Sequence, residues 1–182
     1  MVEDPRSTGL AEPLTPVIGQ HVRLEPYIRG LSPRDTLVKL WQFMERCPGG
    51  AAKIFWTQQV AVETQRGDPE SYMAAFSQRI SLAVYRRREQ EIVGHVWFEN
   101  VSAQESAQIG LLYHRRVWGP VAREATALAC AWAVEWVKVQ RIFGITPFRL
   151  AVRHAEAVGF KLVGILPGFT LGRDVFVLCL EA

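Results

Sequence analysis

The sequence has few cysteines and no long apolar run. Cys47, Cys130 and Cys179 are widely spaced and form no CxxC pair. An odd number of cysteines at such spacing argues against a disulfide framework or a zinc site. No stretch approaches the roughly 18 consecutive apolar residues of a membrane-spanning helix, and the N-terminus lacks the basic and then apolar pattern of a secretory signal. We therefore expect a cytoplasmic protein with no metal site and no membrane partner.

The excess of one charge sign is also small. The 182 residues carry a formal net charge of +3, which gives no general reason to expect a nucleic acid as partner. Hydrophobic residues make up 49% of the chain, enough to bury one sizeable core in one domain. Some of the basic residues form two short clusters, 86–88 and 114–116. The first is most simply a solvated hairpin tip, but such clusters can also serve an anionic ligand.

The first twenty residues differ from the rest of the chain. They are rich in proline, glycine, serine and threonine and show no apolar period. We expect a loose N-terminal arm over residues 1–20. Residues 21–182, which contain no repeat or low-complexity segment, are predicted to form a single domain.

The order of the predicted elements indicates a mixed sheet flanked by helices. Alternating or apolar runs bounded by turn residues predict strands over 21–26, 81–85, 91–101, 106–113, 141–146, 160–166 and 174–180. Helical spacing predicts helices over 33–47, after Gly67–Asp68, over 121–138 and over 147–157. Residues 51–66 fit neither pattern clearly. Antiparallel hairpins combine with two late crossover helices, so we expect an α+β domain with a mixed, mostly antiparallel sheet.

One strand-to-helix junction is a candidate anion site. The strand that ends at Tyr113 is followed by basic residues, a turn at Trp118–Gly119 and a helix start without bulky side chains. A helix N-terminus presents unpaired N–H groups and the positive end of the helix dipole. This arrangement suits a phosphate or diphosphate, with Arg116 and Arg123 as charge partners. The alternative is that the glycine only makes a turn.

Four segments carry patterns that belong together by order and spacing. They are RLEP at 23–26, GHVWFENV at 94–101, IGLLY at 109–113 and AEAVGFKLVG at 155–164. Together they resemble the GCN5-related N-acetyltransferases (GNAT superfamily), and within it the RimJ/RimL-like group, over nearly all of 22–180. The resemblance implies a central sheet whose middle strands splay into a V, here between 106–113 and 141–146.

The resemblance also implies a cofactor and a reaction. Acetyl-CoA would bind in the V, and its acetyl group would pass to a primary amine by direct attack in a ternary complex. The acceptor would be a protein N-terminus or a small amine, and the protein a monomer or homodimer. Backbone groups of Leu112 and Tyr113 would pair with the pantetheine arm, and the amides of 121–124 would hold the diphosphate. The implied cofactor-binding residues are Leu111, Leu112, Tyr113, Arg116, Trp118, Gly119, Val121, Ala122, Arg123 and Glu124.

The chain departs from the family pattern at several positions. Pro120 has no N–H to offer an anion, and Val121 stands where a small residue is usual. Ala155 replaces the tyrosine that many members place before the Gly–Phe pair, and Phe148 replaces an asparagine. These departures favour a second hypothesis, an inactive CoA-binding, structural or regulatory protein of the same fold. A nucleobase-amine acyltransferase is a third, but no basic face interleaved with aromatic residues supports it.

Strand 91–101 offers candidates for acid–base chemistry. His95, Trp97 and Glu99 share one face of the strand, and two basic groups on one face indicate a cleft. We expect Glu99 first and His95 second as the general base or as the residue that holds a water in that role. Tyr113 is the candidate proton donor to the leaving thiolate. The alternative for these three residues is a purely structural role. His154 is expected on a solvated helix face.

Overall fold

The computed structural model describes residues 15–27, 32, 34–47, 79–170 and 172–182. Within these residues the strands form one eight-stranded sheet in the order β1-β2-β3-β4-β5-β6-β8-β7. The strands are β1 Val17–Ile18, β2 Val22–Tyr27, β3 Ile80–Arg86, β4 Ile92–Ser102, β5 Ser106–Tyr113, β6 Arg141–Thr146, β7 Lys161–Thr170 and β8 Arg173–Glu181. The helices are α1 Arg34–Arg46, α5 Pro120–Trp132 and α6 Arg149–Glu156.

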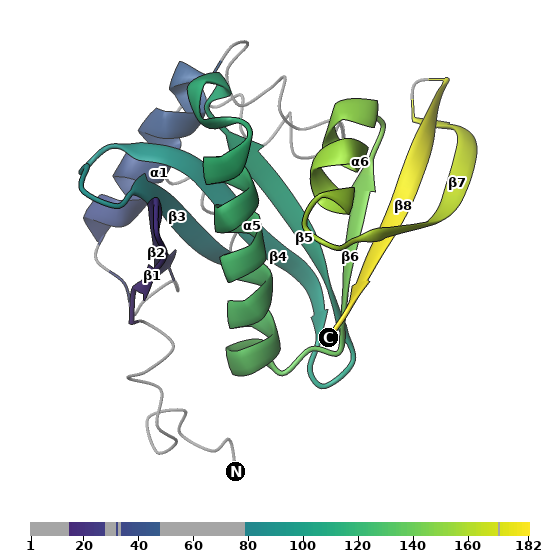
Figure 1. The fold of residues 1–182 in the computed structure, drawn as a ribbon, viewed down its shortest axis with the longest axis horizontal. Helices are drawn as coiled ribbons and strands as arrows, with labels where there is room; N and C mark the ends of the chain where they lie inside the picture. Colours follow the sequence, from purple (N-terminus) through teal and green to yellow (C-terminus); the bar gives the residue numbers. More distant parts are fainter. Residues whose placement is uncertain (1–14, 28–31, 33, 48–78, 171) are drawn as a thin grey trace.

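The pairing of β5 with β6 sets the shape of the sheet. All other neighbouring strands are antiparallel, whereas β5 and β6 are parallel. Their register runs only from Ser106 opposite Arg141 to Ile109 opposite Gly144. Beyond that point the two strands diverge, as Figure 1 shows. This confirms the expected mixed, mostly antiparallel sheet with splayed middle strands.

Helices cover both faces of the sheet. On one face α1 contributes Leu40, Phe43 and Met44 to a buried cluster with Tyr85 and Trp97. On the other face α5 and α6 pack on a larger core (Figure 1). Alternation along β4 sends successive side chains to these two cores, because neighbouring residues of a strand point to opposite faces. β4 therefore contributes side chains to both packed layers.

Small residues let α5 lie close to the sheet. Ala122, Ala125 and Ala129 are fully buried along one stripe of the helix. Near the end of the helix Trp132 stacks on Phe98, with ring centroids 6.5 Å apart. The helix closes in a π-helical turn, Ala133–Val137, before β6 begins. The predicted helical segment 121–138 is confirmed.

The sequence located the other described elements to within a few residues. The strands predicted over 106–113 and 141–146 have the observed bounds, and the helix predicted over 33–47 is α1. The short strand β1, which pairs with β2, was missed because it falls inside the predicted loose arm. The helix predicted after Gly67–Asp68 and the ambiguous segment 51–66 lie outside the described residues.

The described residues also bear on disulfides, metal binding and membrane-spanning helices. Cys47, Cys130 and Cys179 are all buried free thiols. Among the described residues no cluster of three or more histidine, cysteine or acidic side chains is arranged to hold a metal ion. None of the described helices has the length and apolar character needed to cross a membrane.

Candidate functional site

A cleft opens where β5 and β6 separate. It encloses about 410 Å³. It is lined by Trp97, Ile109, Gly110, Leu111, Leu112, Trp118, Gly144, Ile145, Thr146, Phe148, Leu150, Ala151, Ala155, Phe160 and Leu178. Residues 110–113 of β5 and 145–146 of β6 have no partner across the gap in the described register. Strand backbone without a partner offers N–H and C=O groups to an extended ligand.

Two glycines keep the cleft open. A Cβ atom on Gly110 would lie 2.0 Å from the indole ring of Trp97, so the ring can lie flat against the strand only because residue 110 has no side chain. At Gly144 a Cβ atom would make only ordinary contacts of 3.9–4.0 Å. Ala155 stands where the resemblance leads one to expect a tyrosine, and it adds little bulk to the wall. These residues together leave a largely apolar channel at the splay.

The start of α5 stands beside this cleft and presents free amides. Gly119 has φ of 105°, a conformation open to glycine, and it gives the helix no side-chain cap. Pro120 occupies the first helical position, one residue before the predicted start, where the missing N–H of a proline costs no helical hydrogen bond. The amide of Arg123 already donates to the carbonyl oxygen of Gly119 at 3.0 Å. Of the amides expected over 121–124 to hold a diphosphate, those of Val121 and Ala122 remain in the part of the first turn that lacks a helical partner.

Arg116 and Glu124, two of the predicted cofactor-binding residues, have side-chain partners within the protein. The guanidinium of Arg116 is ion-paired with Glu91, which also lies 3.7 Å from Arg46. The carboxylate of Glu124 accepts hydrogen bonds from the backbone amides of Gln20 and His21. Glu124 therefore ties the turn between β1 and β2 to α5. The Glu124 side chain thus makes a structural contact, and the Arg116 guanidinium is engaged by Glu91.

A buried hydrogen-bond chain connects β5, α5 and α6. Thr126 Oγ1 donates to the carbonyl oxygen of Ala122 at 2.9 Å. Because a hydroxyl has a single proton, its lone pairs accept from the hydroxyl of Tyr113 at 2.8 Å and from Nε2 of His154 at 2.9 Å. This assigns the imidazole proton to Nε2 and leaves Nδ1 as an acceptor. Tyr113 is thus held away from the cleft, and burial raises the pKa of its hydroxyl.

His154 is not on a solvated helix face, which corrects the expectation from the sequence. Its ring lies 5.9 Å from that of Trp118 and 5.8 Å from that of Tyr113. Burial lowers the pKa of His154, and the nearby charge of Arg123 lowers it further. Trp118 is 42% exposed, lines the cleft and donates its indole N–H to the carbonyl oxygen of Tyr113 at 3.3 Å. That carbonyl, expected to pair with a pantetheine arm, already has one partner.

His95 is fully buried. Its ring lies 5.1 Å from Trp97, on the face of the sheet covered by α1. Burial, with a smaller contribution from Arg79, lowers the pKa of His95 to about 3. The imidazole is therefore neutral at physiological pH and is a weak acceptor of protons.

The carboxylate of Glu99 is held by two neighbours near the end of β4. One oxygen pairs with Nε of Arg79, and the other accepts from Nε2 of Gln108 at 2.9 Å. The Glu99 side chain is 20% exposed. Solvent and a held water can therefore reach it, unlike His95.

The structure brings together only part of the predicted set. Leu111, Leu112 and Trp118 line the cleft, and Gly119, Val121 and Ala122 form the helix start beside it. Glu99, His95 and Tyr113 are not among the described residues that line the cleft. The sequence reasoning missed the packing of Trp97 on Gly110, the small wall residues Gly144 and Ala151, and the contacts of His154. The spacing of His154 on its helix gave a partial signal, since it shares a turn with Ala151 and Ala155.

Comparison with known proteins defines the fold to which this site belongs. No protein-family model matches the sequence, and no curated protein sequence matches it. Solved structures do match, and among them are two named acetyltransferases, one of them with CoA, and RimJ with CoA-disulfide. The chain therefore has the fold of the GNAT-family acetyltransferases, which confirms the fold implied by the four sequence segments.

Three structures illustrate the similarity. The ribosomal-protein-S5-alanine acetyltransferase from Vibrio fischeri has a TM-score of 0.71 and 13% identity, over 92% of this chain and 96% of that one. The spermidine N-acetyltransferase from Vibrio cholerae, in complex with CoA and spermine, has a TM-score of 0.68 and 14% identity, over 90% and 96%. RimJ from Mycobacterium smegmatis, in complex with CoA-disulfide, has a TM-score of 0.60 and 19% identity, over 88% and 82%.

Proposed function

We propose that this protein is an acetyl-CoA-dependent N-acetyltransferase acting on a primary amine. The observation that carries the proposal is the open cleft at the splay of β5 and β6, with the uncapped start of α5 beside it. A pantetheine arm is long, thin and amide-bearing, and the unpaired strand backbone matches it. The apolar walls and the room left at Gly144 and Ala155 fit such an arm. The structural neighbours act on amines or bind CoA, which supports the same reading.

The reaction combines proton removal from the amine, attack on the thioester and protonation of the leaving thiolate. The amine must lose a proton before or as its nitrogen attacks the thioester carbon, the C–S bond then breaks, and the thiolate takes up a proton. Holding the two reactants in line can contribute about 7–11 kcal/mol to lowering the barrier. A backbone N–H on the open edge of β5 can stabilise the charge that develops on the carbonyl oxygen. Acetyl-CoA supplies the activated acetyl group.

Glu99 is the residue we propose as the holder of the water that accepts the proton of the amine. It is partly exposed, and both of its oxygens are positioned by Arg79 and Gln108. His95 is less suited because its buried imidazole has a pKa of about 3. Tyr113 donates its hydroxyl proton to Thr126 and lies on the α5 side of the sheet. Protonation of the thiolate by a solvent molecule at the cleft mouth is consistent with this placement.

The proposed function is tested by binding and turnover together. Purified protein is titrated with CoA and with acetyl-CoA by calorimetry, and thiol release is then followed with a panel of amines. The panel contains polyamines, short peptides with free N-termini and small aromatic amines. We expect binding in the micromolar range and thiol release with at least one amine class. Absence of binding at high micromolar cofactor would rule the proposal out.

Replacement of Glu99 by glutamine is expected to lower kcat by about 10²-fold or more while CoA affinity stays the same, since general-base assistance contributes 10²–10⁴. The matched control is Glu105→Gln, the same change on an exposed hairpin residue that hydrogen-bonds Ser102. If the Glu99–Arg79 ion pair is purely structural, Glu99→Gln is expected to lower the melting temperature and to leave the pH profile of kcat unchanged. The proposed role predicts loss of the acid limb of that profile, because a general base acts only when deprotonated.

A second candidate function is favoured by one observation. None of Glu99, His95 and Tyr113 is among the described residues that line the cleft, and Ala155 offers no acid there. A CoA-binding protein of structural or regulatory use would have this arrangement. Tight CoA binding without thiol release across the whole panel would favour this candidate over the enzyme.

A further inference from the structure

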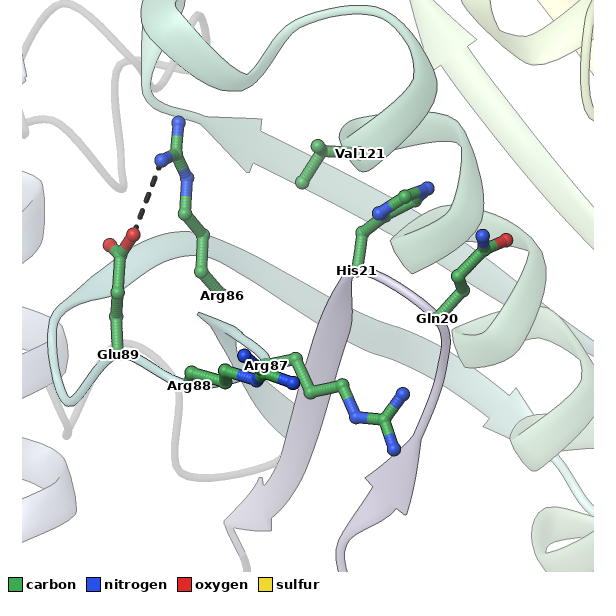
Figure 2. Close-up of a pocket in the computed structure, with 7 residues that line it drawn as sticks. All are labelled: Gln20, His21, Arg86, Arg87, Arg88, Glu89 and Val121. Atoms are coloured by element: carbon green, nitrogen blue, oxygen red, sulfur yellow. Dashed lines mark hydrogen bonds and ion pairs between the residues drawn. The ribbon is translucent and has the colours of Figure 1, made fainter.

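A second pocket lies on the other side of the α5 start, at the tip of the β3–β4 hairpin. It encloses about 360 Å³. Its walls come from the hairpin tip, from the turn between β1 and β2, and from the first turn of α5. They are Gln20, His21, Arg86, Arg87, Arg88, Glu89 and Val121 (Figure 2).

The pocket carries an excess of positive charge. Arg86 is paired with Glu89 through Nη1 at 3.2 Å. No ion pair joins Arg87 or Arg88 to an acidic side chain of the described residues, and both are exposed. The Nε atom of Arg86 is buried and has no hydrogen-bond partner among the described residues. A buried donor without a partner is unfavourable, so an anionic acceptor here would be stabilised.

The walls of the pocket are held together by hydrogen bonds. The backbone amide of Arg87 donates to the carbonyl oxygen of His21 at 2.9 Å. The carboxylate of Glu124 accepts from the amide of His21 at 3.0 Å, which fixes the β1–β2 turn to α5. The hairpin, the turn and the helix are therefore linked in one frame. A preformed basic pocket loses less entropy on binding than a mobile one.

The position of the pocket indicates which part of a ligand bound in the cleft would reach it. Val121 lines it, and Trp118, which lines the cleft, lies three residues earlier in the chain. The two pockets thus flank one helix start, whose free amides belong to Val121 and Ala122. A ligand whose arm fills the cleft and whose diphosphate meets these amides would extend its next group past the first turn of α5. In CoA that group is a ribose bearing a 3′-phosphate.

We propose that the Arg86–Arg88 pocket binds the 3′-phosphate of CoA. The proposal rests on the proposed function, because it assumes that the arm of CoA occupies the cleft. Guanidinium groups suit a phosphate because they donate several charge-assisted hydrogen bonds. The start of α5 adds a favourable dipole. The chain would then discriminate CoA from the same molecule without its 3′-phosphate.

The test compares CoA with 3′-dephospho-CoA by calorimetry. The wild-type chain is expected to bind CoA about tenfold more tightly, and Arg87→Ala/Arg88→Ala is expected to lose that preference by weakening CoA alone. The matched control is Arg141→Ala/Arg173→Ala, which removes the same charge from two exposed arginines at other strands. That control is expected to keep the preference. The preference is also expected to shrink as salt is raised, since partly exposed charges are screened.

The possible results separate the two proposals. Equal wild-type binding of the two ligands would overturn the 3′-phosphate assignment and leave the proposed function standing. An equal loss of affinity for both ligands in Arg87→Ala/Arg88→Ala would also overturn the assignment. The arginines would then act on the diphosphate, or through the overall positive potential of this surface, and not on the 3′-phosphate. Failure of the wild-type chain to bind either ligand would overturn the proposed function together with this inference.

Discussion

Replacement of Gly144 by tryptophan is expected to abolish CoA binding and to leave the fold intact. Gly144 lies opposite Ile109, the last register pair of β5 and β6, where the cleft opens. A side chain at this position would start beside Ile109, Phe160 and Leu178, which line the cleft. An indole would occupy space that the pantetheine arm needs, and overpacking of about 3 kcal/mol corresponds to a loss of affinity of about 100-fold or more. Calorimetry measures the affinity, and thermal melting followed by circular dichroism measures the fold.

Gly144→Ala is the matched control for this experiment. The Cβ atom would meet Ile109, Leu178 and Phe160 at 3.9–4.0 Å, which are ordinary contacts. Gly144 is also not among the described glycines with positive φ, so the backbone accepts a side chain. The alanine variant is expected to bind CoA within about threefold of wild type, less than 1 kcal/mol. If the tryptophan variant binds as tightly as the alanine variant, the cofactor does not occupy the splay.

The sequence predicted the described elements well where a local pattern decides them. The runs at 106–113 and 141–146, bounded by turn residues, predicted β5 and β6 with their observed bounds. β1 was missed because two residues carry no period, and it forms through the pairing of Val17 with Leu24 and of Ile18 with Arg23. The splay itself was implied by the resemblance and not by the residues. No local pattern reports where two parallel strands stop pairing.

The candidate site was predicted less well, because its side chains have partners far away in the sequence. The turn at Trp118–Gly119 and the proline at the helix start were located from local rules. The contact of Glu124 with the β1–β2 turn spans over one hundred residues, and that of Arg116 with Glu91 spans 25. The contact of His154 with Thr126 spans 28. A pattern read within one strand or one helix contains no information on such pairs, so these roles needed the structure.

Acid is expected to destabilise this protein partly through His95. An unfolded histidine titrates near pH 6.5, whereas burial lowers the pKa of His95 to about 3 in the folded chain. The unfolded state therefore binds a proton first as the pH falls, and folded stability is lost below about pH 6.5 and continues to fall toward pH 3. The loss is about 1.4 kcal/mol for each pH unit, so about 2 kcal/mol between pH 6.5 and 5. Denaturant unfolding at both pH values measures it.

The comparison that isolates this contribution is the pH dependence of wild type against that of His95→Phe. Carboxylates and His154, whose pKa is also lowered, contribute to both chains, so the difference in slope belongs to residue 95. The variant is expected to lose about 2 kcal/mol less than wild type over this pH range, whatever its stability at neutral pH. Equal slopes would show that His95 is protonated in the folded chain near pH 6. Its neighbour Trp97 forms a wall of the cleft, so protonation there would couple the proposed cofactor site to pH.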